Sequence, residues 1–240
     1  MKPTLLVLPL AMLLLCCSPT KKITTTNTVI PDIGEIGKLD ITLFHKDFLP
    51  VGKPSLIKPI TLAARQIPFT KSQFKAYAQL KQGGGEEVPL QYIDSILNKP
   101  KYISLEISDR IGLQQQLNGE VNSGAREYLV QDESYGMVTK VSLRTKPSYW
   151  ETILASDEVY LSQTSTGTHT LEIHQNNTIH FIPFSELEIF EYTTASFCWG
   201  LNKYGKEIIK AIPTTGEACP HNTEKKAYKL NENKSYLRFK

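Results

Sequence analysis

Residues 168–184 read THTLEIHQNNTIHFIPF and carry the clearest strand signal in the chain. Apolar and polar residues alternate on both sides of Asn176-Asn177, which is the period of a half-buried β-strand. Asparagine tolerates the positive φ angles that a two-residue hairpin turn requires. These residues therefore predict an antiparallel β-hairpin made of strands 168–175 and 178–184.

From Gly136 onward, the chain on both sides of this hairpin has a similar strand-like pattern. Short runs with strand periodicity are separated by polar turns. The predicted strands are Met137–Thr145, Glu158–Gln163, one or two strands within Leu187–Trp199, and a last strand at Ser235–Phe239. Consecutive strands joined by short turns favour an antiparallel sheet.

Helices are expected mainly before this sheet. Thr70 and Gln73 match a capping box, in which each side chain satisfies a backbone amide at the start of a helix. The Gly83–Gly85 run ends that helix. Ser148 and Glu151 match a second capping box, which predicts a helix over residues 148–155.

The rest of the first half mixes helices and strands. Further helices are expected over residues 89–97, 113–117 and 123–130, further strands over 38–48 and 102–108, and a short element of unassigned type over 60–64. Helices clustered in residues 70–130 and followed by an antiparallel sheet indicate the α+β class. We therefore predict an α+β fold whose sheet is dominated by the C-terminal half, with helices mainly in residues 70–130 and 148–155.

The N-terminus carries an apolar run, Leu5–Leu15, that ends at Cys16-Cys17. A membrane-spanning helix needs about 20 apolar residues, so the run is too short to span but suits a secretory signal. Residues 1–17 resemble the export signal of bacterial lipoproteins, in which a leucine-rich core ends at a lipidated cysteine. The rest of the chain resembles no family in this way.

The resemblance implies that Cys17 carries the lipid. This choice places Leu14 three residues upstream, as the lipoprotein pattern prefers, whereas Cys16 would place bulky Leu15 directly before the modified residue. Cys16 stays the alternative lipidation site, and an ordinary cleaved signal peptide is the alternative interpretation. Ser18 is not the aspartate that marks inner-membrane retention in enteric-type lipoproteins, so the resemblance implies the outer membrane.

The lipoprotein pattern divides the chain into three parts. Residues 1–16 are expected to be the signal peptide that is removed, and residues 17–37 the lipidated cysteine and a flexible tether. The tether is rich in Thr, Lys, Pro and Gly, and its few apolar residues keep no period. Residues 38–240 have the length and composition of a single globular domain.

Charge and cysteine usage narrow the class of protein further. The 240-residue chain has a net charge of +3, which does not point to nucleic acid as a partner. Beyond the signal, Cys198 and Cys219 are the cysteines that remain, and a pair in an exported chain favours one disulfide. Two free thiols, or a catalytic Cys219 beside His221, are the alternatives.

The histidines of the hairpin are the first metal-site candidate. The turn sets a register that pairs His174 with Ile179, so His174 and His180 point to opposite faces of the sheet. His169 shares a face with His180 but lies about 13 Å away along the strands. Three ligands about 2 Å from one zinc ion cannot come from these positions, so we expect sheet-surface histidines and no metal.

Three further motifs are expected to carry no chemistry. Ser55 and Lys58 match the S-x-x-K spacing of penicillin-binding enzymes, but Pro59 disfavours the helical turn that this chemistry needs. Gly83–Gly85 lacks the G-K-[ST] of a phosphate loop, and acidic pairs such as Glu86-Glu87 sit in loop-like sequence. We therefore predict no catalytic residues and no cofactor.

Aromatic residues are dense in the C-terminal half, and we expect most of them in the core. They are Phe181, Phe184, Phe190, Tyr192, Phe197 and Trp199. Exposed on a sheet face, they would instead bind a glycan or a protein.

The expected function is therefore a lipid-anchored envelope protein on the periplasmic side of the outer membrane. It would act as a non-catalytic binding or structural component, with the membrane and an envelope protein or glycan as partners. A periplasmic hydrolase whose site is assembled from scattered residues is the alternative.

Overall fold

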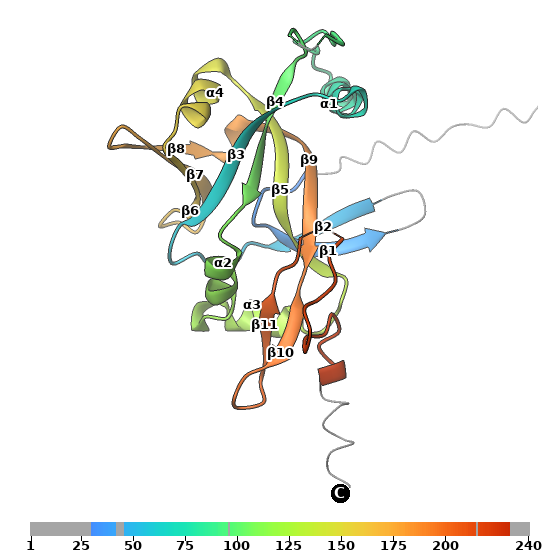
Figure 1. The fold of residues 1–240 in the computed structure, drawn as a ribbon, viewed down its shortest axis with the longest axis vertical. Coiled ribbons are helices and arrows are strands. Elements are labelled where there is room, and N and C mark those ends of the chain that lie inside the picture. Colours follow the sequence, from blue (N-terminus) through green and yellow to red (C-terminus); the bar gives the residue numbers. More distant parts are fainter. Residues whose placement is uncertain (1–29, 42–45, 96, 215, 231–240) are drawn as a thin grey trace, which may run out of the picture.

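The computed structural model describes residues 30–41, 46–95, 97–214 and 216–230. The predicted signal peptide, both candidate lipidation cysteines and the predicted strand 235–239 lie outside these residues. The protein has an α+β fold built on a large antiparallel sheet, as the sequence predicts (Figure 1).

The helices are α1 (Lys71–Gly83), α2 (Arg110–Leu117), α3 (Ser123–Leu129) and α4 (Pro147–Leu154), with short 3-10 turns η1 (Glu120–Asn122) and η2 (Phe184–Glu186). The strands are β1 (Ile36–Ile41), β2 (Lys46–Gly52), β3 (Ile60–Pro68), β4 (Lys101–Ile107), β5 (Tyr135–Thr145), β6 (Glu158–Gln163), β7 (His169–Gln175), β8 (Thr178–Pro183), β9 (Leu187–Ser196), β10 (Cys198–Leu201) and β11 (Glu207–Ala211).

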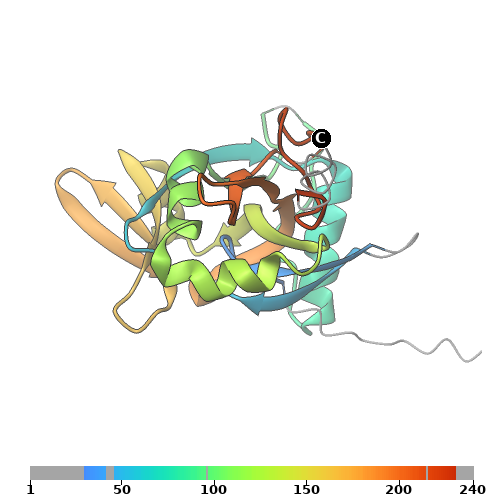
Figure 2. The same ribbon diagram turned by 90° about the horizontal axis from the view of Figure 1, so that it is seen from below.

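Strand β5 is the centre of the main sheet. Along one edge it pairs with β9, and along the other it pairs first with β1 and then, further on, with β4. The sheet therefore divides at β5 into a short arm, β1–β2, and a long arm in the order β4-β3-β6-β7-β8. Strands β10 and β11 form a separate hairpin. Seen from below in Figure 2, this hairpin gathers with α2 and α3 at one end of the molecule.

The core has two parts. Most buried apolar side chains form one cluster along the sheet, and β5 contributes Met137, Val138, Val141 and Leu143. A smaller aromatic cluster of Phe69, Tyr77, Tyr102 and Phe190 lies where α1 packs on β9. Aromatic rings in such contact add to the stabilisation that burial alone supplies.

The hairpin in residues 168–184 has the predicted register. Ile173 lies opposite His180, and His174 lies opposite Ile179. Asn176 and Asn177 both adopt positive φ angles, as a two-residue turn of this type requires. The register prediction is confirmed because turn chemistry and strand period both specify it.

The two predicted capping boxes have different outcomes. Thr70 and Gln73 cap α1 reciprocally, as predicted. Ser148 and Glu151 do not form a box, because α4 begins two residues earlier than predicted, with Lys146 at the N-cap and Pro147 as the first helical residue. The helix itself is confirmed and its capping prediction is wrong.

The helix predicted over residues 89–97 is wrong. Its described residues are irregular, and Leu97 is 89% exposed. Leu90 and Tyr92 instead pack against the aromatic cluster, with the Tyr92 ring 5.3 Å from the ring of Phe74. The contacts of an extended segment with α1 therefore outweigh its helical pattern. Strand β11 has no counterpart among the predicted strands.

The predicted boundary between tether and folded domain is also wrong. The domain includes Ile33, whose side chain is 0% exposed, and β1 begins at Ile36. Ile30, Ile33 and Ile36 recur every third residue, which is neither the strand nor the full helical pattern, so periodicity missed them. The single strand predicted over residues 38–48 is instead divided between β1 and β2.

Candidate functional site

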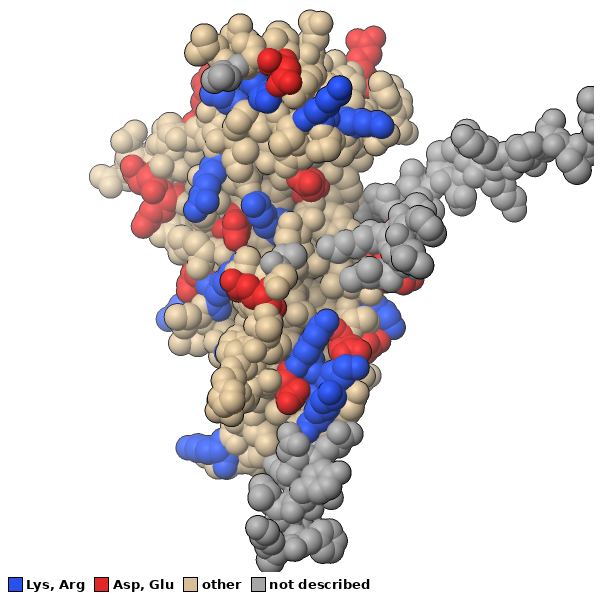
Figure 3. Space-filling view, turned by 45° about the vertical axis from the view of Figure 1, so that its right-hand side comes forward, with Lys and Arg blue, Asp and Glu red and all other residues tan. Residues whose placement is uncertain are grey.

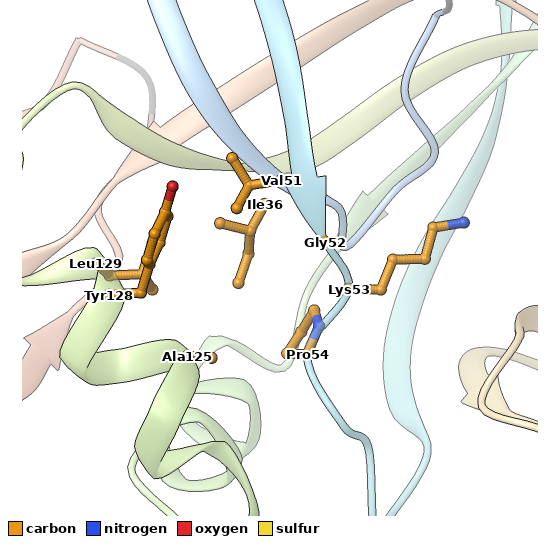
Figure 4. A pocket seen from close by; sticks show the side chains of 8 residues that line it. All are labelled: Ile36, Val51, Gly52, Lys53, Pro54, Ala125, Tyr128 and Leu129. Atoms are coloured by element: carbon orange, nitrogen blue, oxygen red, sulfur yellow. The ribbon is translucent and has the colours of Figure 1, made fainter.

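A small apolar cavity opens between β2 and α3, and we call it the β2–α3 cavity. Its volume is about 170 Å³. The residues that line it are Ile36, Val51, Gly52, Lys53, Pro54, Ala125, Tyr128 and Leu129. Figure 4 shows Ile36 and Val51 facing Tyr128 across the space, with Lys53 pointing away. The walls are therefore hydrocarbon and aromatic ring.

Helix α3 supplies one wall because Ala125, Tyr128 and Leu129 share a helical face at i, i+3 and i+4. Leu129 is buried beneath the cavity, and Tyr128 is exposed at its rim. The buried guanidinium of Arg126 donates to the carbonyl oxygen of Leu117 at 3.1 Å, which holds α3 against the end of α2. The wall is therefore fixed by a charge-assisted hydrogen bond.

The strap of residues 53–58 supplies the opposite wall. The side chain of Asn122 accepts from the backbone amide of Ser55 and donates to the carbonyl of Ser55, both at 2.9 Å. Gln116 accepts from the amide of Ile57 at 2.7 Å. These side chains replace the backbone pairing that the strap lacks, and so they position Pro54 in the cavity wall.

The rim of the cavity carries exposed apolar groups and paired charges. Leu49 and Val51 on β2 are both exposed. The rings of Tyr128 and Tyr135 lie 5.0 Å apart, and a hydrogen bond between their hydroxyls raises the pKa of Tyr135 to about 12. An apolar centre with a polar edge is the anatomy of a protein-binding surface.

Next to this tyrosine pair, Lys38 forms a 2.8 Å ion pair with Asp132. The hydrogen bond from Lys38 lowers the pKa of Asp132 to about 2. Asp132 is therefore ionised at any physiological pH, and the rim keeps its charge.

Behind the cavity, a buried polar group joins the strap to the sheet. His169, which is 1% exposed, donates from Nε2 to the carbonyl of Pro54 at 3.0 Å. Its Nδ1 has no hydrogen-bond partner. Burial lowers the pKa of His169, and the nearby Lys53 ammonium, which is paired with Asp32, lowers it further.

The outer face of β6, β7 and β8 carries a polar network beside two apolar side chains. Tyr160 donates to the Glu158 carboxylate at 2.6 Å, and His174 donates from Nε2 to Glu172 at 2.8 Å. The His174 and Tyr160 rings lie 5.0 Å apart. Ile179 and Phe181 of β8 flank this network and are exposed.

A second cavity, of about 220 Å³, lies between β3 and the segment that joins α4 to β6. Its carboxylates, Asp157 and Glu158, are engaged elsewhere. Asp157 accepts from the amide of Asn176 at 3.0 Å, and Glu158 accepts from Tyr160. Asp157 therefore stabilises the hairpin turn, Glu158 binds Tyr160, and the two carboxylates do not converge on this cavity.

The cysteines singled out from the sequence lie together. Cys198 and Cys219 are joined in a disulfide, with their Cα atoms 5.5 Å apart, inside the limit of about 7 Å that a disulfide requires. His221 is exposed in the following turn. The bond ties the segment after β11 to the start of β10.

The three hairpin histidines have different environments. His174 is half-buried on the outer face of the sheet and His180 is exposed on the opposite face, as the predicted register requires, but His169 is buried, and the surface prediction is wrong for it. Within residues 30–230, apart from the gaps given above, no group of three or more His, Cys, Asp or Glu side chains is placed to hold a metal ion.

The other singled-out residues take structural positions. Ser55 lies in the strap, outside any helix, and Gly84 is the C-cap of α1. Phe184, Phe190, Phe197 and Trp199 are buried and Tyr192 is half-buried, as a core role predicts. Phe181 is the exception, because β8 is the edge strand of the sheet.

The residues of the β2–α3 cavity were not singled out from the sequence. A usable signal was present in β2, KDFLPVG, where Leu49 and Val51 lie on one face while Phe48 packs on the other. A strand that is apolar on both faces has either two buried faces or one face left for a partner.

No helix of the part that the structure describes is long and apolar enough to cross a membrane. No protein-family model, curated protein or solved structure matches this chain.

Proposed function

We propose that this protein is a lipid-anchored component of the bacterial cell envelope that holds a partner protein without chemical turnover. The observation that carries the proposal is the β2–α3 cavity, an apolar space lined in part by the exposed side chains of Val51 and Tyr128. Pockets of this kind receive the anchoring side chains that dominate protein–protein affinity.

The size and chemistry of the cavity favour one apolar side chain as its occupant. Small-molecule sites occupy about 300–1,000 Å³, so a cavity of about 170 Å³ is too small for a whole ligand. A glycan would need several converging hydrogen-bond groups, whereas these walls are hydrocarbon and a tyrosine ring. An aromatic or branched aliphatic side chain of a protein matches both the volume and the walls.

The charge distribution also suits a protein partner. On the face shown in Figure 3, basic and acidic side chains lie beside one another rather than in separate patches. Near the cavity the charges are paired, as in Lys38–Asp132 and Lys53–Asp32. Such a surface attracts neither polyanions nor polycations strongly, so shape and apolar burial select the partner.

The anchor part of the proposal rests on the lipoprotein-like N-terminus, with Cys17 lipidated at the periplasmic face of the outer membrane. Labelling cells with a fatty-acid analogue tests it. We expect label on the wild-type chain and on Cys16→Ser, and none on Cys17→Ser. Label that persists on Cys17→Ser and is lost on Cys16→Ser would move the lipid to Cys16, and an unlabelled wild-type chain would contradict the anchor.

The cavity is tested by photo-cross-linking in cells. A photoreactive phenylalanine analogue at Val51 is expected to give one discrete cross-linked product. The same analogue at Tyr204, an exposed residue far from the cavity in sequence, is the control and should not give it. Ala125→Phe, which fills the cavity from α3, should abolish the Val51 product.

The outcome depends on the filled variant being folded. Its thermal midpoint is therefore measured first, and Ala125→Leu serves as a smaller filler if phenylalanine destabilises α3. A Val51 product that persists in a folded, filled variant would show that the cavity does not receive the partner.

A further inference from the structure

The long arm of the sheet ends in an edge strand that is open to pairing. In the part of the chain that the structure describes, β8 pairs with β7 alone. Figure 1 shows the β7–β8 hairpin projecting from the side of the molecule, and Figure 2 shows the same from below. Residues 178–181 of β8 are exposed, so this part of the edge is open to a partner strand.

The register shows which backbone groups of β8 are unpaired in the sheet. The two-residue turn makes Gln175 and Thr178 a hydrogen-bonded pair, so the next pair, His174 and Ile179, is not hydrogen-bonded. In agreement, the carbonyl of His174 accepts from the amide of Asp157 on the β6 side. The amide and carbonyl groups of Ile179, and of Phe181 two residues on, therefore point away from β7 along the open edge.

The side chains of the same two residues form an apolar pair on the outer face. Ile179 is 52% exposed and Phe181 is 60% exposed. A β-branched and an aromatic side chain are the types that stabilise neighbouring strands by cross-strand contact. Strand β8, TIHFIP, contains no Lys, Arg, Asp or Glu to oppose pairing.

The edge at the other end of the sheet, in contrast to β8, is protected against pairing with another strand. The edge strand β2 carries Pro50, which lacks an amide hydrogen, together with Lys46 and Asp47. Charges and proline are the usual means by which edge strands avoid pairing. In β8 a proline occurs only at the last position, Pro183, so residues 178–182 lack this protection.

We propose that β8 pairs with β8 of a second copy of this chain, antiparallel and about a two-fold axis at His180. This register places Ile179 of each copy opposite Phe181 of its partner, and the outward amide and carbonyl groups of both residues form the hydrogen bonds. The two sheets then continue into one.

Self-complementarity selects a second copy over another occupant. The two-fold register pairs aromatic with β-branched side chains on both sides of the axis, as an isologous interface requires. The charges of the outer face are Glu172 on β7, one strand behind the edge, and Glu158 on β6, two strands behind it, so like charges do not meet across the axis.

The size of the interface predicts a weak dimer. A single pair of six-residue strands buries less surface than the roughly 1,200 Å² at which stable interfaces begin. The pairing is therefore concentration-dependent in solution. If the chain is lipid-anchored, as proposed above, confinement to one membrane surface raises the effective concentration and favours the dimer.

Disulfide cross-linking of the purified full chain tests the register. His180 lies opposite itself across the axis, at about 4.5 Å between Cα atoms for a pair without hydrogen bonds, which is within reach of a disulfide. His180→Cys should therefore give several-fold more cross-linked dimer than Thr178→Cys. The two copies of residue 178 are offset by four residues, or about 13 Å, along the strands. The wild-type chain, measured in parallel, gives the background of cross-links that form through its own cysteines.

A second variant distinguishes specific pairing of two β8 edges from cross-links that form by random collision. Phe181→Lys in the His180→Cys background should reduce cross-linking to the Thr178→Cys level, whereas Tyr204→Lys, at an exposed aromatic residue elsewhere, should not. Filling the β2–α3 cavity with Ala125→Phe should leave the dimer unchanged, which keeps this inference independent of the proposed function. Equal cross-linking of His180→Cys and Thr178→Cys would overturn it.

Discussion

The burial of His169 follows from the strand pattern around it, but its hydrogen bond does not. It shares strand parity with Leu171 and Ile173, which are both buried, so the alternation that predicts β7 also places His169 inside. The expectation of a surface position came from the polarity of histidine. Its hydrogen bond to the carbonyl of Pro54 could not be predicted, because the two residues are 115 positions apart in the chain.

The buried histidine predicts an acid-sensitive component of stability. Burial and Lys53 lower the pKa of His169 below its usual 6.5, so the unfolded chain binds a proton more readily than the folded chain. The free energy of unfolding should therefore fall as the pH drops below 6.5. The charged groups that act on the ring are Lys53 and Asp32, and Glu35 lies near both of them. Burial raises the pKa of Glu35 above 4.5, so Glu35 contributes with the opposite sign at lower pH.

Chemical denaturation between pH 7.5 and 5 measures this component. The difference between wild type and His169→Gln should depend on pH, while contributions of Glu35 common to both largely cancel. His180→Gln, which removes an exposed histidine, is the control and should keep the wild-type profile. A His169→Gln profile parallel to that of the wild type would contradict the prediction.

At the scale of elements, the two capping motifs show what local sequence can and cannot specify. Both match the pattern of a hydroxyl residue followed by Glu or Gln three positions later. Pro147 decides the second case, because proline favours the first helical position and makes Lys146 the N-cap. The pattern around Thr70 has no such competitor, since Pro68 lies before the cap.

The caps therefore predict unequal losses of stability for two similar substitutions. Thr70→Ala removes the acceptor for the amide of Gln73 and should lower the free energy of unfolding by about 1 kcal/mol. Ser148→Ala should cost less than about 0.5 kcal/mol, because Ser148 uses only its backbone carbonyl, which accepts from Thr152. Urea denaturation of both variants measures the difference. Equal losses would mean that the α4 cap involves Ser148 after all.

The disulfide connects a segment without regular structure to β10. The amide of Trp199 also donates to the carbonyl of Glu224 at 2.7 Å, and the amide of Glu224 donates back at 2.9 Å. These backbone bonds and the Cys198–Cys219 bond together hold the chain beyond β11 against the hairpin.

Removing the disulfide should therefore destabilise the fold and loosen this segment. On the chain-entropy model, a closed loop of about 20 residues contributes roughly 3 kcal/mol. We expect the double variant Cys198→Ala/Cys219→Ala to lose about this much, and a reductant to affect the wild type but not the variant. Denaturation with and without reductant tests it, and mass spectrometry that finds two alkylatable thiols in the unreduced protein would refute the bond.

For the whole molecule, the sequence predicts the class and most strands but not the order of the strands. Short turns specify neighbours such as β7 and β8. The pairings of β5 with β1, β4 and β9 join distant parts of the chain, and no local pattern records them. The β2–α3 cavity arises in the same way, from residues 36, 51–54 and 125–129, so its site residues could not be predicted together.

The boundary between the tether and the domain can be tested by comparing the stability of two truncated chains. Ile33 and Ile36 are buried in the main cluster, and the turn at Gly34 lies against the ring of His169. Burying one such side chain contributes about 1.5–3 kcal/mol, a large share of a typical total of about 5–15 kcal/mol. A chain that starts at Lys38 should therefore unfold at a clearly lower temperature than one that starts at Ile30.

A pair of glycine variants tests the same boundary without truncation. Gly34 and Gly167 both have positive φ, so alanine is strained at each. At Gly34 the added Cβ would also meet Leu161 Cδ2 at 2.6 Å, whereas at Gly167 the nearest atom is 3.8 Å away. Gly34→Ala should therefore be the more destabilising. Equal effects of the two variants, together with equal thermal midpoints of the two truncated chains, would mean that the turn does not pack on the domain.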